Sequence, residues 1–333
     1  MEPYKCIIIG CGKIGMEYGA DRGRVPPRSH IEAAFNNLKV KLVAVSDSDT
    51  ERLEEIKKYA PGINIYSDTK SALDLEKPDI AIIAASTSAH KDLINLVYDA
   101  GIKMIICEKP LCESIFDAEG LAKKLQNSNV VFVLNYQRRF FSLFKDIKSE
   151  LSRGRIGRIQ QINCCYSNGL YNNAGHLLDA IMFLTGEHAT TASGIINKTN
   201  CLHPKNDFNI DGFLELENGA RVAFQSFDQN AYGIHEMTIY GTTGLVAIKE
   251  HGYLAEWKKV KIKSGIPIFD KEEFIRREES FVKGALDEVI KCYEQGENPS
   301  SGLKNGTDVL ITLDSLVKSA LNNGLITPVR YEF

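Results

Sequence analysis

The chain opens with a short apolar segment that runs into closely spaced glycines. Ile7, Ile8 and Ile9 form an unbroken β-branched run, and residues 10–15 have the spacing G-x-G-x-x-G. Such a run is typical of a strand buried on both faces of a parallel sheet. The glycines permit a tight turn, close approach of a pyrophosphate and packing of the next helix. A glycine-rich turn without a ligand remains the alternative, because this spacing alone is weakly specific.

Length and composition indicate a globular protein of about two domains. The 333 residues are 44% hydrophobic and 25% charged, and the net charge of −3 provides no basic surface for nucleic acid or membranes. No apolar run approaches the roughly 18 residues of a membrane span. The eight cysteines include no C-x-x-C pair, which favours buried free thiols over a zinc site. We therefore expect a cytoplasmic protein without a metal, nucleic acid or membrane partner.

Strands and helices alternate through the first part of the chain. The strands are expected at residues 7–9, 40–46, 63–66, 79–84, 102–107 and 130–134. The helices between them are expected at residues 50–59, 69–75, 90–100 and 114–126. This alternation predicts an α/β domain, comprising residues 1–134, that is built on a doubly wound parallel sheet.

The pattern changes after residue 140, and residues 135–333 are expected to form a second domain. Its strands are expected at residues 158–168, 208–217, 221–227, 235–241 and 245–250. Its helices are expected at residues 141–153, 174–184, 272–295 and 306–322. Hairpin-length turns such as Asn218-Gly219, which tolerates positive φ, join successive strands. This predicts an α+β domain with a large, mostly antiparallel open sheet.

An acidic residue, Asp47, follows the second predicted strand. A dinucleotide-binding fold uses a carboxylate at this place to bind the adenosine ribose. It lies further from the glycines than usual, which an inserted loop at residues 16–30 explains. Because no arginine stands beside Asp47 in the sequence, a 2′-phosphate would be repelled, and NAD is preferred to NADP. The alternative is that Asp47 caps the helix at 50–59, a role open also to Asp49.

Polar residues follow three of the predicted parallel strands. Ligands of such sheets bind beyond the carboxyl ends of the strands. The residues placed there are Ser86, Thr87, Glu108, Lys109 and Asn135. A desolvated Lys109 could hold a substrate hydroxyl and assist its deprotonation while a hydride leaves for a nicotinamide. The alternative is that Glu108 and Lys109 form an ion pair at the surface.

A second polar cluster occupies residues 172–179. If a helix begins here, Asn172, His176 and Asp179 share one face. A histidine in a first helical turn is kept neutral by the helix dipole, which suits a general base. The alternative is a structural histidine bonded to Asp179.

Together these motifs resemble the Gfo/Idh/MocA family of oxidoreductases (glucose–fructose oxidoreductase, inositol dehydrogenase, rhizopine catabolism) over nearly the whole chain. Glu108-Lys109-Pro110 is the most specific motif. The others are the glycine turn, Ser29-His30, Asp47, Thr87-x-x-His90, residues 135–140, His176-x-x-Asp179, Asn218-Gly219, residues 241–244 and Ser319-Ala320…Gly324. The resemblance implies a Rossmann domain and NAD(P)-dependent redox chemistry at a carbon of a sugar, cyclitol or nucleotide-sugar. It also implies a homodimer or homotetramer formed through the C-terminal sheet.

The resemblance further implies roles for single residues. Lys109 would hold the reacting hydroxyl, and His176 would be the acid/base. The substrate site would be shaped by Asn172, Asp179 and Arg139, with Tyr166 as a further candidate. The cofactor, NAD rather than NADP, would be bound by Gly10, Cys11, Gly12, Lys13, Ile14, Gly15, Asp47, Ser86, Thr87, His90, Glu108, Lys109, Asn135 and Gln137.

The sequence departs from the family at one position. The family often carries an aspartate four residues before the histidine, and this chain has Asn172 there. Because an asparagine cannot take a proton, proton transfer would fall to His176 and Lys109. Two alternatives therefore stay open: a catalytically silent NAD-binding sensor or assembly protein, and a lyase or hydrolase that recycles its nicotinamide during a redox-assisted elimination.

Overall fold

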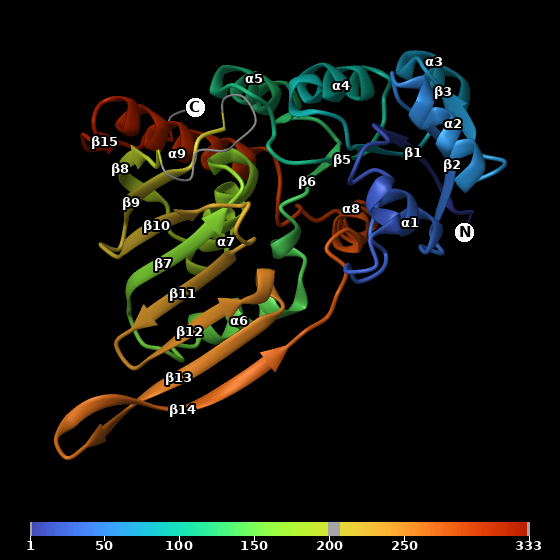
Figure 1. Cartoon of the computed structure of the whole chain (residues 1–333). Helices are drawn as coiled ribbons and strands as arrows, with labels where there is room; N and C mark the ends of the chain where they lie inside the picture. Colours follow the sequence, from blue (N-terminus) through green and yellow to red (C-terminus); the bar gives the residue numbers. More distant parts are fainter. Residues whose placement is uncertain (1, 199–206, 332–333) are drawn as a thin grey trace. The chain divides into compact units, whose positions relative to one another are not determined.

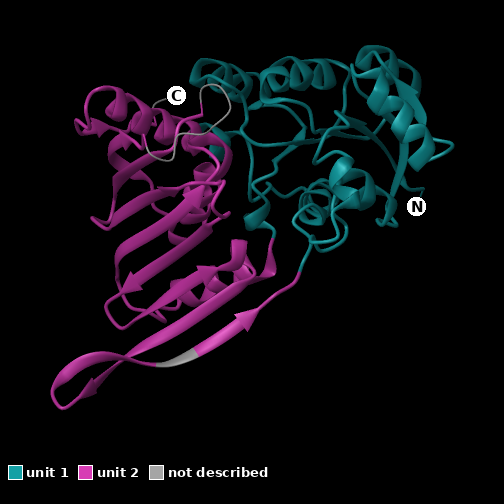
Figure 2. Ribbon diagram, in the orientation of Figure 1, with its two compact units in different colours: residues 1–140, 279–307 teal, residues 141–278, 308–333 magenta. Residues whose placement is uncertain are grey.

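The computed structural model describes residues 2–198 and 207–331 (Figure 1), which fall into two compact units. The first unit comprises Met1–Phe140 and Glu279–Thr307, and the second comprises Phe141–Glu278 and Asp308–Phe333 (Figure 2). The sequence predicted a single boundary after residue 134. The structure instead returns a late segment of the chain to the first unit. One predicted thiol, Cys201, lies outside the described residues.

Among its described residues, the first unit contains a six-stranded sheet with the order β3-β2-β1-β4-β5-β6. Neighbouring strands are parallel throughout. The strands are β1 (Tyr4–Ile9), β2 (Val40–Ser46), β3 (Asn64–Tyr66), β4 (Ile80–Ile83), β5 (Met104–Cys107) and β6 (Val131–Leu134). Every residue of β4 and β5 is buried, as the apolar runs predicted. The predicted doubly wound parallel sheet is confirmed.

The helices of the first unit mostly begin after a polar residue, although the helix at 283–295 begins after Val282. They are α1 (His30–Phe35), α2 (Thr50–Tyr59), α3 (Thr69–Glu76), α4 (Thr87–Asp99), α5 (Ile115–Leu125) and α8 (Lys283–Gln295). The side chain of Asp49 accepts hydrogen bonds from the first turn of α2, and Asp68 does the same for α3. The residue that caps α2 is therefore Asp49 and not Asp47.

The predicted helix at 272–295 is wrong in its first part. Residues up to Arg276 belong to strand β14 (Ile266–Arg276), which pairs with β13 (Leu254–Lys263), and α8 begins only at Lys283. Sheet pairing has overridden the helix propensity of a Glu- and Arg-rich segment. Buried residues of α8, including Leu286 and Val289, pack in the hydrophobic core of the first sheet. This packing explains why the late segment belongs to the first unit.

In the second unit, the described strands form a nine-stranded sheet with the order β14-β13-β12-β11-β7-β10-β9-β8-β15. Only the β7–β10 pair is parallel among these described pairings. The remaining strands are β7 (Ile159–Ser167), β8 (Ala189–Ile196), β9 (Ile210–Leu216), β10 (Arg221–Phe227), β11 (His235–Gly241), β12 (Gly244–Lys249) and β15 (Thr327–Pro328). The predicted, mostly antiparallel sheet is confirmed, although the sequence did not identify β8, β13, β14 and β15.

Helices cover one face of this sheet. They are α6 (Ser142–Ser152), α7 (Gly175–Thr185) and the part of α9 (Leu303–Leu321) that lies in the second unit. Leu214 and Phe224 are buried on the sheet, whereas Phe213, one residue away on β9, is exposed. The alternation shows that the opposite face is open. None of the helices in the described residues is long and apolar enough to cross a membrane.

We expect Gly284→Ala to destabilise the protein. A Cβ atom at Gly284 of α8 would lie 2.4 Å from the Cβ of Phe140. Because the core is close-packed, the free energy of unfolding should fall by about 1–3 kcal/mol. The matched control is Gly120→Ala in α5, where a Cβ meets nothing within 4 Å, and which should stabilise by about 0.5–1 kcal/mol. Urea unfolding measures both, and equal effects would show that α8 does not pack as described.

Candidate functional site

The glycine turn between β1 and the next element has two glycines that packing requires. Gly10 has φ +95°, and a Cβ there would lie 2.5 Å from the amide nitrogen of Ala85. A Cβ at Gly15 would lie 2.3 Å from the carbonyl oxygen of Gly10. Gly12 differs, because the nearest described atom to its added Cβ is a guanidinium nitrogen of Arg52 at 3.7 Å. Packing among the described residues therefore does not require a glycine at position 12, and the backbone is open on that side.

The segment after the turn is a loop, as predicted. Met16 donates its N–H to the Gly12 carbonyl in a single turn, and a 3-10 helix, η1 (Glu17–Ala20), follows. α1 begins only after the loop, where His30 and Ile31 donate their N–H groups to the carbonyls of Ile14 and Gly15. The insertion therefore separates the turn from the helix that packs on it.

Asp47 is bound to the glycine turn. Its Oδ2 accepts the N–H of Cys11 at 2.6 Å, and its Oδ1 accepts the N–H of Asp49 at 2.9 Å. Arg52 was not predicted as a site residue, but its guanidinium lies 3.8 Å from Asp47 and 3.6 Å from Asp49. The same guanidinium lies 3.8 Å from Glu17. Its spacing from Asp49, one helical turn, was the signal that could have found it.

The carboxylate of Glu108 joins three segments at the carboxyl edge of the sheet. Its Oε1 lies 2.9 Å from Nε2 of His30 at the start of α1, and it accepts a 2.6 Å hydrogen bond from Asn135 after β6. Burial raises the pKa of Glu108, but the bonds to His30 and Asn135 and the charge of Lys109 outweigh it, so the pKa is lowered. Glu108 is therefore not half of a surface ion pair with Lys109. Lys109, the next residue, is half-buried.

Two predicted ligand residues hold the protein itself together. The imidazole of His90 lies 2.8 Å from the carbonyl oxygen of Pro110 and 3.1 Å from that of Ala85. These contacts give His90 a structural role between the loops after β5 and β4, and its contact with the cofactor stays a prediction. Arg139, in η2 (Gln137–Arg139), is buried and donates to the carbonyl of Ser300 at 2.8 Å. This bond gives Arg139 a structural role, and its predicted substrate contact stays a prediction.

Other predicted residues lie along the same edge of the first unit. Ser86 and Thr87 stand at the start of α4, directly after β4, and their side chains are exposed and half-buried respectively. Lys13 is exposed in the glycine turn, and Gln137 is half-buried in η2. The structure thus brings the predicted cofactor residues of the first unit to one sheet edge.

His176 stands in the first turn of α7, directly after a π-helical turn, η3 (Leu170–Ala174). Both His176 and Asp179 are buried. The ring of His235, from β11, meets that of His176 edge to face with centroids 6.4 Å apart. On its other side His235 stacks on His251, also at 6.4 Å. The sequence did not indicate this row of three histidines, because it joins residues far apart in the chain.

Asn172 and Tyr166 have defined partners in the second unit. The amide nitrogen of Asn172 donates to the carbonyl of Asn168 at 3.1 Å. Tyr166 is 0% exposed, and its hydroxyl donates to the carbonyl and accepts from the N–H of Ile210, both at 2.7 Å. A ligand cannot reach Tyr166, so its prediction as a substrate residue is wrong. Its phenol instead anchors the start of β9 in the core.

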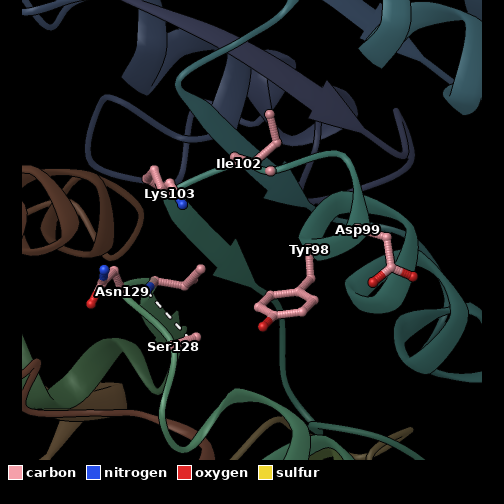
Figure 3. Close-up of a pocket in the computed structure, with 8 residues that line it drawn as sticks. Tyr98, Asp99, Ile102, Lys103, Ser128 and Asn129 are labelled. Atoms are coloured by element: carbon pink, nitrogen blue, oxygen red, sulfur yellow. Dashed lines mark hydrogen bonds between the residues drawn. The ribbon is translucent and has the colours of Figure 1, made fainter.

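A cavity of about 360 Å³ lies at the other edge of the first sheet (Figure 3). Its lining residues precede β5 and β6, whereas Glu108 and Asn135 follow these strands. The lining consists of Tyr98, Asp99, Gly101, Ile102, Lys103, Ser128, Asn129 and Val130. Because parallel strands carry their ligands at the carboxyl ends, this cavity is separate from the cofactor edge.

Comparison with known proteins agrees with this geometry. Residues 4–136 match the model of an oxidoreductase family with an NAD-binding Rossmann fold. The inositol 2-dehydrogenase of Rhizobium meliloti is 22% identical over 336 residues, covering 94% of this chain and 95% of the relative. The crystal structure of myo-inositol 2-dehydrogenase from Lactobacillus plantarum superposes with a TM-score of 0.78 at 19% identity, covering 99% of this chain and all of that one. An oxidoreductase from Agrobacterium radiobacter in complex with NAD⁺ gives 0.75 at 16% identity, with 98% of each chain covered.

We expect Glu108→Gln to lower stability at neutral pH. Because the folded pKa of Glu108 lies below its unfolded value, the ionised carboxylate stabilises the fold above about pH 4.3. This stabilisation is lost as the pH falls through the folded pKa. At about pH 7 the variant should lose about 1–3 kcal/mol, as expected for hydrogen bonds to a buried charge, and the deficit should shrink on acidification.

Urea unfolding at several pH values measures this difference. The control is Glu55→Gln on the exposed face of α2, which should change stability by less than about 0.5 kcal/mol. A deficit of Glu108→Gln that grew as the pH fell would contradict the assignment.

Proposed function

We propose that this chain is a dehydrogenase of the Gfo/Idh/MocA family of oxidoreductases and that it transfers a hydride between NAD and a sugar, cyclitol or nucleotide-sugar. The observation that carries this proposal is the edge at which the glycine turn, Asp47 and the Glu108-Lys109 pair meet. The named relatives that act on inositols support a cyclitol or sugar substrate.

The residues of the first unit fit a bound NAD. Gly12 leaves its backbone open to a pyrophosphate, and Asp47 is held by Cys11 at the place where the adenosine ribose would bind. When bound, NAD supplies the hydride acceptor for alcohol oxidation. The protein's own part is to bind and orient both partners and to move the hydroxyl proton.

We propose NAD rather than NADP because of the charge around Asp47. Asp47, Asp49 and Glu17 surround one guanidinium, that of Arg52, at 3.6–3.8 Å. Three carboxylates against one cation leave a negative site, which repels a 2′-phosphate. We expect kcat/KM with NAD to exceed that with NADP at least about tenfold, or by about 1.4 kcal/mol. Assays with each cofactor test this, and a preference for NADP would contradict it.

Lys109 and His176 are proposed as the groups that handle the proton. Lys109 follows a buried carboxylate at the end of β5 and is itself half-buried. We assign it to hold the reacting hydroxyl. His176 is buried at the start of α7 and is assigned as the acid/base.

The direct experiment is a substrate panel. The protein is incubated with NAD and with inositols, plain sugars and sugar nucleotides, and NADH formation is recorded together with the shift in melting temperature. Because Asn172 cannot take a proton, a silent NAD-binding sensor is the second candidate. The sensor would bind NAD and oxidise none of these compounds, so turnover of any one of them excludes it.

We expect Lys109→Ala to reduce turnover by about 10²–10⁴, the range for one acid/base group. NAD affinity should stay within a few-fold, because the glycine turn and Asp47 are untouched. The matched control is Lys103→Ala, which changes an exposed lysine before the same strand, β5, and should leave turnover unchanged. Unchanged turnover in Lys109→Ala would remove Lys109 from the mechanism.

We also propose that the protein forms a homodimer or homotetramer through the open face of the second sheet. Phe213 and Ile195, which lie on neighbouring strands of this face, are 60% and 57% exposed. Light scattering should therefore give the mass of two or four chains, and Phe213→Asp should lower it. Phe116→Asp, at an exposed position of α5, is the control that should leave the mass unchanged. A monomeric wild type would contradict the proposal.

We further propose a cytoplasmic location. The cysteines among the described residues are free thiols, a state that the reducing cytoplasm maintains.

A further inference from the structure

The helix that carries His176 begins on a distant segment of the chain. The first backbone N–H groups of a helix have no partner within the helix. Here Gly169 donates to the side-chain oxygen of Asn209 at 3.0 Å, and Leu170 donates to the carbonyl of Phe208 at 3.1 Å. The next two N–H groups go to one carboxylate. Residues 207–209, which we call the capping segment, thus satisfy the whole start of η3.

That carboxylate belongs to Asp207. Its Oδ1 accepts the N–H of Tyr171 at 2.8 Å, and its Oδ2 accepts the N–H of Asn172 at 3.0 Å. A capping side chain normally comes from the residue at the helix start, but that residue is Gly169. Gly169 has φ +88°, and a Cβ there would lie 2.1 Å from Oδ2 of Asp207. The glycine therefore leaves room for a cap supplied from elsewhere in the chain.

The neutral side chain at position 172 fits this arrangement. The amide of Asn172 donates to the carbonyl of Asn168, a bond that a carboxylate cannot make. An aspartate at 172 would also place a second negative charge on the residue whose N–H already binds Asp207. Two negative charges held in the same helical turn would repel each other. The turn thus carries one carboxylate, which comes from Asp207 of the capping segment, while the side chain of Asn172 stays neutral.

We propose that Asp207 is a positioning residue of the active site, which sets the turn from which α7 presents His176 and places a negative charge at that helix start. This inference rests on the proposed function, in which His176 is the acid/base. His176 follows Asn172 by four positions, across the end of the π-helical turn η3 and the start of α7. The negative charge of Asp207 opposes the positive end of the helix dipole at the turn that precedes His176.

Other charged or titratable groups also act on this helix. Those contributed by α7 and the elements around it are Asp179 of α7, Tyr171 of η3, His235 of β11, His251 of η4 (Glu250–Gly252), Lys148 of α6 and Asp314 of α9. Burial, and then the charges of Asp314 and Asp207, raise the pKa of the Tyr171 phenol. The field of Asp207 is therefore felt within the turn. The experiment leaves all of these groups in place, so it isolates the one charge.

The test is Asp207→Asn, followed by NMR titration of the His176 ring, which His176→Gln identifies. Loss of the negative charge should lower the His176 pKa by about 0.3–1 unit. The acid limb of the kcat/KM profile for alcohol oxidation should move to lower pH by the same amount. The local control is Asn209→Ala, which removes an uncharged acceptor from the same helix start and should lower the melting temperature without moving the titration.

Two further variants complete the test. Asp68→Asn removes a carboxylate that caps α3 in the first unit. It should lower the melting temperature about as much as Asp207→Asn does, but leave the titration of His176 unchanged. The double variant Asp207→Asn with Asn172→Asp returns a carboxylate to the turn and should move the His176 titration back toward wild type. Because this variant restores the charge, it also serves if the single variant fails to fold.

An unchanged His176 titration in Asp207→Asn would overturn the proposal and leave a purely structural cap. If only the double variant folds, a His176 titration that stays displaced from wild type, although the carboxylate has been restored, would overturn it. The NMR readout does not depend on turnover. A wild type inactive toward the whole substrate panel would therefore defeat the proposed function alone, while the titration would still decide the role of Asp207.

Discussion

The buried carboxylate of Glu108 is the interaction on which the cofactor half of this protein depends. A charge in a protein interior is tolerated only when neighbouring groups compensate for it. His30 and Asn135 do so here, and they come from the start of α1 and the end of β6. One side chain thereby fixes the distance between three segments. Lys109 is the next residue in the chain. The hydrogen bonds that hold Glu108 therefore also help to place the proposed catalytic amine.

The same principle recurs at two other carboxylates. Asp47 accepts the N–H of Cys11, which ties the end of β2 to the glycine turn. Asp207 accepts two N–H groups at the start of the His176 helix. In each case an acidic side chain binds backbone or neutral donors from a segment distant in sequence. Such bonds define geometry more sharply than apolar packing, because they require particular atoms at short distances.

Local patterns predicted much of the fold. The boundaries of β2, α2, β10 and β11 agree with expectation, because the apolar period and the turn residues at their ends are local properties. The helix expected at 272–295 failed in its first part for the converse reason. Its Glu- and Arg-rich residues have helix propensity, but pairing with β13 made them a strand. The return of α8 to the first unit was equally invisible, because it depends on which core the helix packs against.

The sequence alone singled out the proposed site residues, since the glycine turn, Asp47, Lys109 and His176 each stand at a recognisable place relative to a strand or helix. Folding decided their partners. Arg52 comes to Asp47, and Asp207 comes to the His176 helix, while Tyr166, His90 and Arg139 are used to hold the protein together. The physical reason is that a spacing encodes only neighbours within one element, whereas a hydrogen bond between distant residues exists only after the elements have packed.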